Sequence, residues 1–331
     1  MSLKHLLNLV HPGHEEFPSG IKGLHAPADA VVDVVFIHDL NGDREQSWTA
    51  QGASEPWPKT LLPAKLPTAR VLTFGYDVMH PTKWRGVVSQ NRIGDHAGNL
   101  LASLASLREA DGTNERPILF VCHGLGGLVC EDALVMSKQK PEPYLRAIQQ
   151  STRGIAFLGT PHQGSNIADW YERWGRRLGH FRPTNLDIVS VLHRESEVLA
   201  RIQNSFHTML KARTVQALPP IEIACFYEEL PLPGIGLAVS MQSAVCPGCG
   251  VPIGIHANHT DMTKFVGAHD PGFVALSREL GRWVREISRT AMQNAKPPSE
   301  SFLKGGQGAA RAWGPGGWQI CHFSGVLLFG V

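Results

Sequence analysis

The segment from 118 to 134, "ILFVCHGLGGLVCEDAL", has the layout of a turn that presents a catalytic side chain. An apolar run ends at His123, a glycine-rich turn follows, and an amphipathic helical pattern begins at Leu125. In the GxSxG form of this turn, small flanking residues let the backbone bend sharply and lift a nucleophilic serine out of the sheet. The apex here is Gly124, so the turn is present and the nucleophilic hydroxyl is not.

Two alternative roles for this turn are not favoured. Glycine-rich turns between a strand and a helix also bind phosphate groups, but the lysine of GxxxxGK[ST] is missing and no GxGxxG follows the first apolar run. A cysteine is not expected to replace the serine either. Cys122 would point into the sheet, and Cys130 lies at least one helical turn past the apex.

Five apolar runs predict the strands that would carry such a turn. They span 31–40, 69–77, 117–123, 154–160 and 220–230. Apolar residues at three- and four-residue spacing predict helices at 91–110, 125–139 and 271–288. Strands that alternate with helices indicate an α/β fold with a mostly parallel sheet and helices on both faces. In such sheets the functional residues lie where strands end and helices begin.

The segments outside this alternation suggest the domain organisation. Residues 1–29 are polar and broken by proline and glycine, so we expect a leader before one α/β domain at 30–290. Residues 165–215 have helical patterns without a strand pattern, which predicts a helical cap inserted over the site. Residues 291–331 are rich in proline, glycine and tryptophan without periodicity, and we expect this low-complexity tail to be disordered.

The composition limits the possible partners and compartments. The 31 basic and 29 acidic residues leave a net charge of +2, too little for the basic field that nucleic acid would require. No window approaches the ~18 consecutive apolar residues of a membrane span, so membrane contact would be peripheral at most. The N-terminal apolar run is too short for a secretory signal. Six cysteines in 331 residues form no dense disulfide framework, which favours a reducing, cytoplasmic location.

Several segments in chain order carry a resemblance to a known family. They read "VVFIHDLNGDREQSWT", "TARVLTFGYD", "FVCHGLGGLVCEDAL", "GIAFLGTPHQGS", "FYEELPLP" and "IGIHANHTDMTKF". Over about residues 24–290 the chain resembles the lipase-like family that includes the serine-active-site-containing protein and the N-terminal domains of many fungal NACHT-type receptors. The resemblance implies an α/β-hydrolase fold, an acyl or lipid ligand, no cofactor, and a signalling role with a protein partner. Family members also occur at mitochondrial or endoplasmic reticulum membranes, the alternative to the cytoplasm.

The same resemblance assigns the catalytic positions. It places the nucleophile at Gly124, the general-base histidine at His259 and the acid that orients it at Glu228. The alternatives are His256 for the base, and Glu229 or Asp169 for the acid.

A second departure from the family's pattern lies in the loop after the first predicted strand. The resemblance implies an oxyanion hole built from the backbone N–H groups of Leu125 and Leu40, with a glycine after His38. This chain has Asp39 instead, and a negative charge near the hole disfavours the oxyanion that the hole must stabilise. Two separate departures, Gly124 and Asp39, predict a catalytically inactive hydrolase.

Other residues are assigned structural roles. His123 and His162 are expected to anchor turns, and Trp170 and Trp174 to form the core of the cap. The "CPGCG" segment at 246–250 has metal or redox spacing, but a zinc site needs two further ligands and no second CxxC exists, although His256 and His259 follow closely. We therefore expect unpaired structural cysteines and no metal.

Three hypotheses follow for the function. The first is an inactive lipase- or esterase-like domain that serves ligand recognition or signalling. The second is an active serine-type ester hydrolase in which Gly124 is an introduced change, although such a change does not explain Asp39. The third is a non-hydrolytic enzyme that uses His259 and Glu228 as acid and base. In the receptors a NACHT region follows this domain; the tail here is expected to come from truncation or an unspliced intron.

Overall fold

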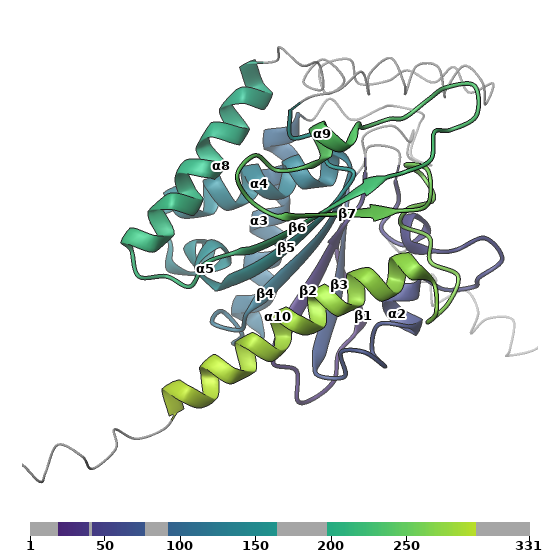
Figure 1. The fold of residues 1–331 in the computed structure, drawn as a ribbon. Helices are drawn as coiled ribbons and strands as arrows, with labels where there is room; N and C mark the ends of the chain where they lie inside the picture. Colours follow the sequence, from purple (N-terminus) through teal and green to yellow (C-terminus); the bar gives the residue numbers. More distant parts are fainter. Residues whose placement is uncertain (1–18, 40–41, 77–91, 164–196, 296–331) are drawn as a thin grey trace, which may run out of the picture. The chain divides into compact units, whose positions relative to one another are not determined.

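A mixed sheet forms the centre of the fold (Figure 1). The computed structural model describes residues 19–39, 42–76, 92–163 and 197–295. Its strands are β1 (Gly20–His25), β2 (Val32–Ile37), β3 (Ala69–Gly75), β4 (Ile118–His123), β5 (Thr152–Leu158), β6 (Glu222–Glu228) and β7 (Val251–Ile255). Their order across the sheet is β1-β3-β2-β4-β5-β6-β7; β1 is antiparallel to β3, and all other neighbours are parallel. The carboxyl ends of β2 and β4 to β7 therefore share one edge, where functional residues are expected.

The central strands are apolar throughout because both faces of the sheet are covered. Every residue of β2 and β4 is buried. Alternate side chains point to opposite faces, so Val35 and Ile37 belong to one core and Val34 and Phe36 to the other. This pattern confirms the predicted α/β class with helices on both faces.

The helices divide between the two faces, as Figure 1 shows. One face carries α3 (Ile93–Ala110), α4 (Leu125–Gln139), α5 (Pro143–Ser151) and α8 (Glu197–Val215). The other carries the 3₁₀ turn η1 (Gln46–Trp48), α2 (Trp57–Thr60) and α10 (Pro271–Ala295). The short helix α9 (Met241–Ala244) lies between β6 and β7 in the chain. The described residues from position 19 to Arg289 belong to one compact unit.

Besides the short helices η1, α2 and α9, which were not predicted, three elements differ from the sequence-based expectation. Strand β1 lies within the expected leader. It was not predicted, because this antiparallel edge strand is mostly half-buried and lacks a continuous apolar run. Strand β7 was not predicted, since it contains a proline and a glycine and is half exposed. Helix α5 was also not predicted, although its apolar residues form one stripe against α3 and α4.

Part of the expected cap belongs to the core instead. Helix α8 packs along α4, and its apolar side chains are buried with those of the sheet. These side chains are Leu199, Ile202, Phe206 and Met209. Residues 164–196, with Trp170 and Trp174, lie outside the described residues, as does the tail at 296–331. Among the described helices, none combines the length and hydropathy needed to cross a membrane.

A buried charge cluster lies at the amino end of β2. Asp33 is fully buried and accepts hydrogen bonds from Arg70 at 2.7 and 2.8 Å, from Arg108, and from Arg116 at 3.2 Å. Arg70 also donates to Asp111 at 2.6 Å. Because several donors share the Asp33 carboxylate, its desolvation is compensated, and the cluster joins β2, β3 and α3.

The two edge strands differ from the interior strands. The pairing of β1 with β3 shifts register between Gly23 and His25, which marks a bulge. Strand β7 pairs with β6 on one side, and its second residue is the exposed Pro252.

Candidate active site

The turn at the end of β4 has the geometry of a nucleophile elbow. Gly124 connects β4 to α4 with φ 51° and ψ −123°, a conformation that strains a residue with a side chain. Its N–H donates to the carbonyl of Leu158, the last residue of β5, at 2.9 Å. The predicted turn is therefore confirmed, and its apex has no side chain.

The Asp39 carboxylate occupies the space above this apex. Its Oδ1 accepts a hydrogen bond from the N–H of Leu125 at 2.7 Å. A Cβ built on Gly124 would overlap this carboxylate, with even the most distant carboxyl atom, Oδ2, at 2.8 Å. Leu125 begins α4, so its N–H group and the positive end of the helix dipole both favour a negative charge here. Asp39 thus uses the donor that was expected to serve an oxyanion.

His259 lies between two carboxylates. Its Nε2 is 3.4 Å from Asp39 Oδ2, and its Nδ1 is 3.5 Å from Glu228 Oε2. All three residues are buried. Burial lowers the pKa of His259, but the hydrogen bond to Asp39 and the charges of Glu228 and Asp39 raise it, and the result lies above 6.5. The two acidic side chains therefore favour the protonated form of the imidazole more than burial disfavours it.

Glu228, at the end of β6, is held as the expected acid would be. Its Oε1 accepts a hydrogen bond from the N–H of Val239 at 2.7 Å. Burial raises the pKa of Glu228, while His259 and neighbouring backbone N–H groups oppose the rise. The alternatives form a different pair, since His256 Nδ1 lies 3.1 Å from Glu229 Oε2 on the surface. The structure thus brings His259 and Glu228 together and leaves the His256 and Glu229 alternatives outside the site.

Three further residues position these groups. The His38 ring stacks on Tyr76, with centroids 4.3 Å apart, and the Tyr76 hydroxyl donates to the His38 carbonyl at 2.8 Å. Because His38 Nδ1 also lies 2.7 Å from the Asp39 carbonyl, this stack fixes the loop that carries Asp39. His123 Nε2 lies 3.0 Å from the His259 carbonyl oxygen. Sequence reasoning missed Tyr76, whose only signal was its place near the end of the predicted strand at 69–77.

Burial determines the charge of His123, while a neighbouring carboxylate determines that of His162. Burial, and then the charge of His259, lower the pKa of His123 to about 3, so it is neutral. Burial also lowers the pKa of His162, but Glu131 at 3.0 Å raises it to about 9. Both histidines bridge separate elements, which agrees with the structural roles predicted for them.

The remaining predicted site residues are not all described. Leu40 and Asp169 lie outside the described residues. The cysteine prediction was wrong on one point, because Cys246 and Cys249 form a disulfide. Within the part of the chain that the structure describes, two clusters hold potential metal ligands within 4.8 Å of one another: Asp39, His123 and His259, and separately His207, Cys246 and Cys249. In the first cluster the Asp39 carboxylate already has protein partners, because Oδ1 accepts the Leu125 N–H and Oδ2 lies 3.4 Å from His259 Nε2.

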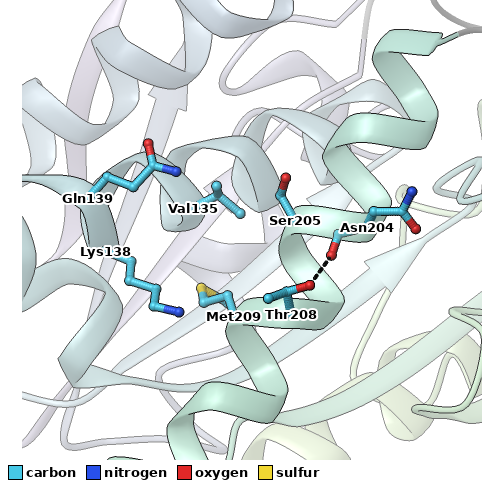
Figure 2. Close-up of a pocket in the computed structure, with 7 residues that line it drawn as sticks. All are labelled: Val135, Lys138, Gln139, Asn204, Ser205, Thr208 and Met209. Atoms are coloured by element: carbon cyan, nitrogen blue, oxygen red, sulfur yellow. Dashed lines mark hydrogen bonds between the residues drawn. The ribbon is translucent and has the colours of Figure 1, made fainter.

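A separate cleft of about 350 Å³ lies between α4 and α8 (Figure 2). It is lined by Val135, Lys138, Gln139, Asn204, Ser205, Thr208 and Met209. The α4 residues of the cleft lie at least ten positions beyond Leu125, about 15 Å along the helix. The cleft is therefore remote from Asp39 and His259, and it contains no acid or base pair.

The order of the site residues along the chain decides the fold family. The elbow follows β4, the acid ends β6, and the histidine follows β7, the order of nucleophile, acid and base in hydrolases built on a mostly parallel sheet. The chain has an α/β-hydrolase fold. In this α/β-hydrolase fold Glu228 and His259 lie at the positions expected for the acid and the base, and the Asp39 carboxylate takes the space above Gly124.

The sequence of this chain is similar to that of known proteins over much of its length. Protein SERAC1 of Mus musculus is 28% identical over 272 residues, which cover 76% of this chain and 39% of that protein. Protein SERAC1 of Danio rerio is 26% identical over 251 residues, covering 70% and 36%. The chain thus spans less than half the length of these relatives. No protein-family profile matches the chain.

Solved structures with a similar fold include lipases. The Bacillus licheniformis lipase BlEst2 has a TM-score of 0.48 at 19% identity, covering 79% of this chain and 99% of that one. Phospholipase PlaB from Legionella pneumophila has a TM-score of 0.43 at 13% identity, covering 60% and 39%. A haloalkane dehalogenase variant from Bradyrhizobium elkanii has a TM-score of 0.45 at 14% identity, covering 83% and 95%.

Proposed function

We propose that this α/β-hydrolase-fold chain does not hydrolyse esters and instead serves recognition or signalling through an acyl or lipid ligand. One observation carries the proposal. The Asp39 carboxylate lies over Gly124, accepts the Leu125 N–H and contacts His259, so it fills the place of both the nucleophile and the oxyanion.

This arrangement removes two contributions to catalysis. Without a side chain at Gly124, no hydroxyl can receive activation from His259 and attack an ester carbonyl. In addition, a carboxylate at the Leu125 N–H keeps a tetrahedral oxyanion away by occupying its donor and by repelling its charge. Removing one oxyanion donor alone costs about 10²–10³-fold in kcat in the protease precedent.

The proposed recognition role rests on the resemblance of the sequence motifs to the lipase-like family. The lipase-like pattern favours an acyl or lipid ligand, and the likeness to the N-terminal domains of fungal NACHT-type receptors favours a signalling protein as the partner. We place the protein in the cytoplasm, with peripheral contact to mitochondrial or endoplasmic reticulum membranes as the alternative; cell fractionation distinguishes the two. Thermal-shift titration with fatty acids and monoacylglycerols tests the ligand class, and an unchanged melting temperature contradicts it.

Ester hydrolysis and active-site labelling test the loss of catalysis. The parent protein, Gly124→Ser, and Gly124→Ser with Asp39→Gly are each incubated with a short p-nitrophenyl ester and a fluorophosphonate probe. We expect no turnover and no labelling for the parent, and labelling only when Asp39 is also removed. Adding His259→Gln to the double variant should abolish its labelling, which shows that the imidazole activates the new serine.

The rival hypothesis gives the opposite result. If Gly124 is an introduced change in an active hydrolase, Gly124→Ser alone restores turnover with Asp39 in place. Turnover by the parent that His259→Gln abolishes also contradicts the proposal, and it would assign His259 and Glu228 to another reaction.

A further inference from the structure

Three metal-binding side chains meet away from the hydrolase site. Cys246 and Cys249 lie in the connection between β6 and β7, and His207 lies on α8. One ligand atom from each lies within 4.8 Å of the other two. The proposed function makes no use of this cluster, and 38 residues of chain lie between positions 207 and 246.

Hydrogen bonds and glycine conformations fix the backbone of the cysteine turn, from Cys246 to Gly250. The N–H of Cys249 donates to the carbonyl of Cys246 at 3.2 Å, and the N–H of Cys246 donates to the sulfur of Cys225 at 3.4 Å. Gly248 and Gly250 have φ of 70° and 88°, which a side chain would disfavour. This turn directs both sulfurs to one point, where the structure joins them as a disulfide.

His207 supplies the observation that the disulfide does not explain. Its Nδ1 is buried and has no hydrogen-bond partner among the residues that the structure describes. A buried polar atom without a partner costs about 1–3 kcal/mol, so such atoms usually have a ligand or a structural reason. An imidazole facing two cysteine sulfurs is explained if all three share a metal ion.

We infer that the reduced Cys246 and Cys249 bind a zinc ion together with His207. Two thiolates at C-x₂-C spacing and one imidazole are donors that zinc prefers, and they provide three positions of a tetrahedron. Water completes the fourth position, since Cys249 is half-buried and the intervening Pro247 and Gly248 are exposed. The ion connects α8 to the loop between β6 and β7.

The disulfide and the metal site are alternative states of the same residues. A dithiol reductant transfers two electrons and two protons to the disulfide, becoming a disulfide itself and leaving two thiols. Zinc binding then displaces the two thiol protons, so the site forms in a reducing compartment and is lost on oxidation.

Metal analysis of the full chain tests this inference. The Cys321→Ser protein, which lacks the tail cysteine, is reduced with a phosphine, which becomes phosphine oxide. It is then loaded with zinc and dialysed against a weak chelator. We expect about one zinc per chain, and cobalt in its place should show the intense absorption of a tetrahedral site with sulfur ligands. His207→Gln and Cys249→Ser should each weaken zinc binding at least about tenfold and change the cobalt spectrum.

His256→Gln is the matched control, because this histidine is exposed and follows the same loop. It should retain zinc and the parent spectrum. Circular dichroism of each zinc-free variant shows whether the fold is intact, and a variant that unfolds is replaced by His207→Asn or Cys249→Ala. The inference fails if the reduced parent retains no zinc, or if folded His207 variants bind zinc as tightly as the parent with the same cobalt spectrum.

Discussion

The Asp39 carboxylate and a side chain at position 124 exclude each other, because the carboxylate lies where such a side chain would begin. The two departures from the hydrolase pattern are therefore one structural change. The missing side chain provides the space, and the carboxylate uses it to accept the Leu125 N–H and to contact His259. The imidazole between Asp39 and Glu228 has a carboxylate on each side.

We expect Gly124→Ala to destabilise the protein through both strain and overlap. Strained φ/ψ costs about 1–3 kcal/mol for a residue with a side chain, and overlap with Asp39 adds to it. Urea denaturation should show that Asp39→Gly recovers part of the loss in the double variant. Gly112→Ala is the control, since Gly112 has φ 64° and nothing within 4 Å of its built Cβ. Additive effects of Gly124→Ala and Asp39→Gly would contradict the overlap.

The pKa of His259 should lie above 6.5 and depend on Asp39. Titration of its ring proton by NMR should show a lower pKa in Asp39→Asn, because that variant removes one of the two neighbouring charges. Glu229→Gln, which affects the exposed His256, should leave the value unchanged.

The raised pKa of His259 also determines whether its contribution to the free energy of unfolding grows or shrinks with pH. Its ion pairs stabilise the fold fully below pH 6.5, the ordinary pKa, and lose this contribution as the pH rises through the folded pKa. The difference in unfolding free energy between the parent and His259→Gln should therefore shrink with rising pH above 6.5. A difference that grows over this range would contradict the assignment.

His162 should show a similar dependence over a defined range. Its pKa of about 9 exceeds the ordinary 6.5 because of Glu131, so the stabilising contribution is complete below pH 6.5 and is lost between 6.5 and about 9. Glu131→Gln should lower the pKa of His162 in an NMR titration and flatten stability across this range. An unchanged pKa would show that another group holds the proton.

Loss of the buried Asp33 carboxylate should lower the free energy of unfolding far more than loss of the exposed Asp111 carboxylate. Asp33→Asn leaves Arg108 buried without its counter-charge, and breaking a buried ion pair costs about 3–5 kcal/mol. Asp111→Asn removes the other partner of Arg70, but Asp111 is 42% exposed, so we expect about 1 kcal/mol or less. Similar losses in urea denaturation would contradict the central role of Asp33.

The sequence predicted the parts of this fold that rely on buried parallel strands. The run at Val32–Ile37 and the turn at Gly124 were identifiable because burial on both faces requires continuous apolar residues and the elbow requires small ones. Edge strands β1 and β7 lack that requirement and were missed.

The site was predictable in composition but not in geometry. Motif order indicated His259 and Glu228, and the structure places them 3.5 Å apart. Asp39 was expected to repel an oxyanion, but only the fold shows that its carboxylate reaches the Leu125 N–H. The contribution of His207 to the cysteine turn depends on α8 packing beside α4, which no local pattern indicates.

The edges of the sheet limit how copies of this protein can associate. An edge strand with regular unpaired N–H and C=O groups can pair with the same strand of a neighbouring molecule and start a fibril. Pro252 removes one N–H donor from β7, and the register shift between Gly23 and His25 disrupts the ladder at β1. Replacing Pro252 with valine would restore a donor beside the exposed Val251, and the protein would then be more prone to polymerise through its own sheet.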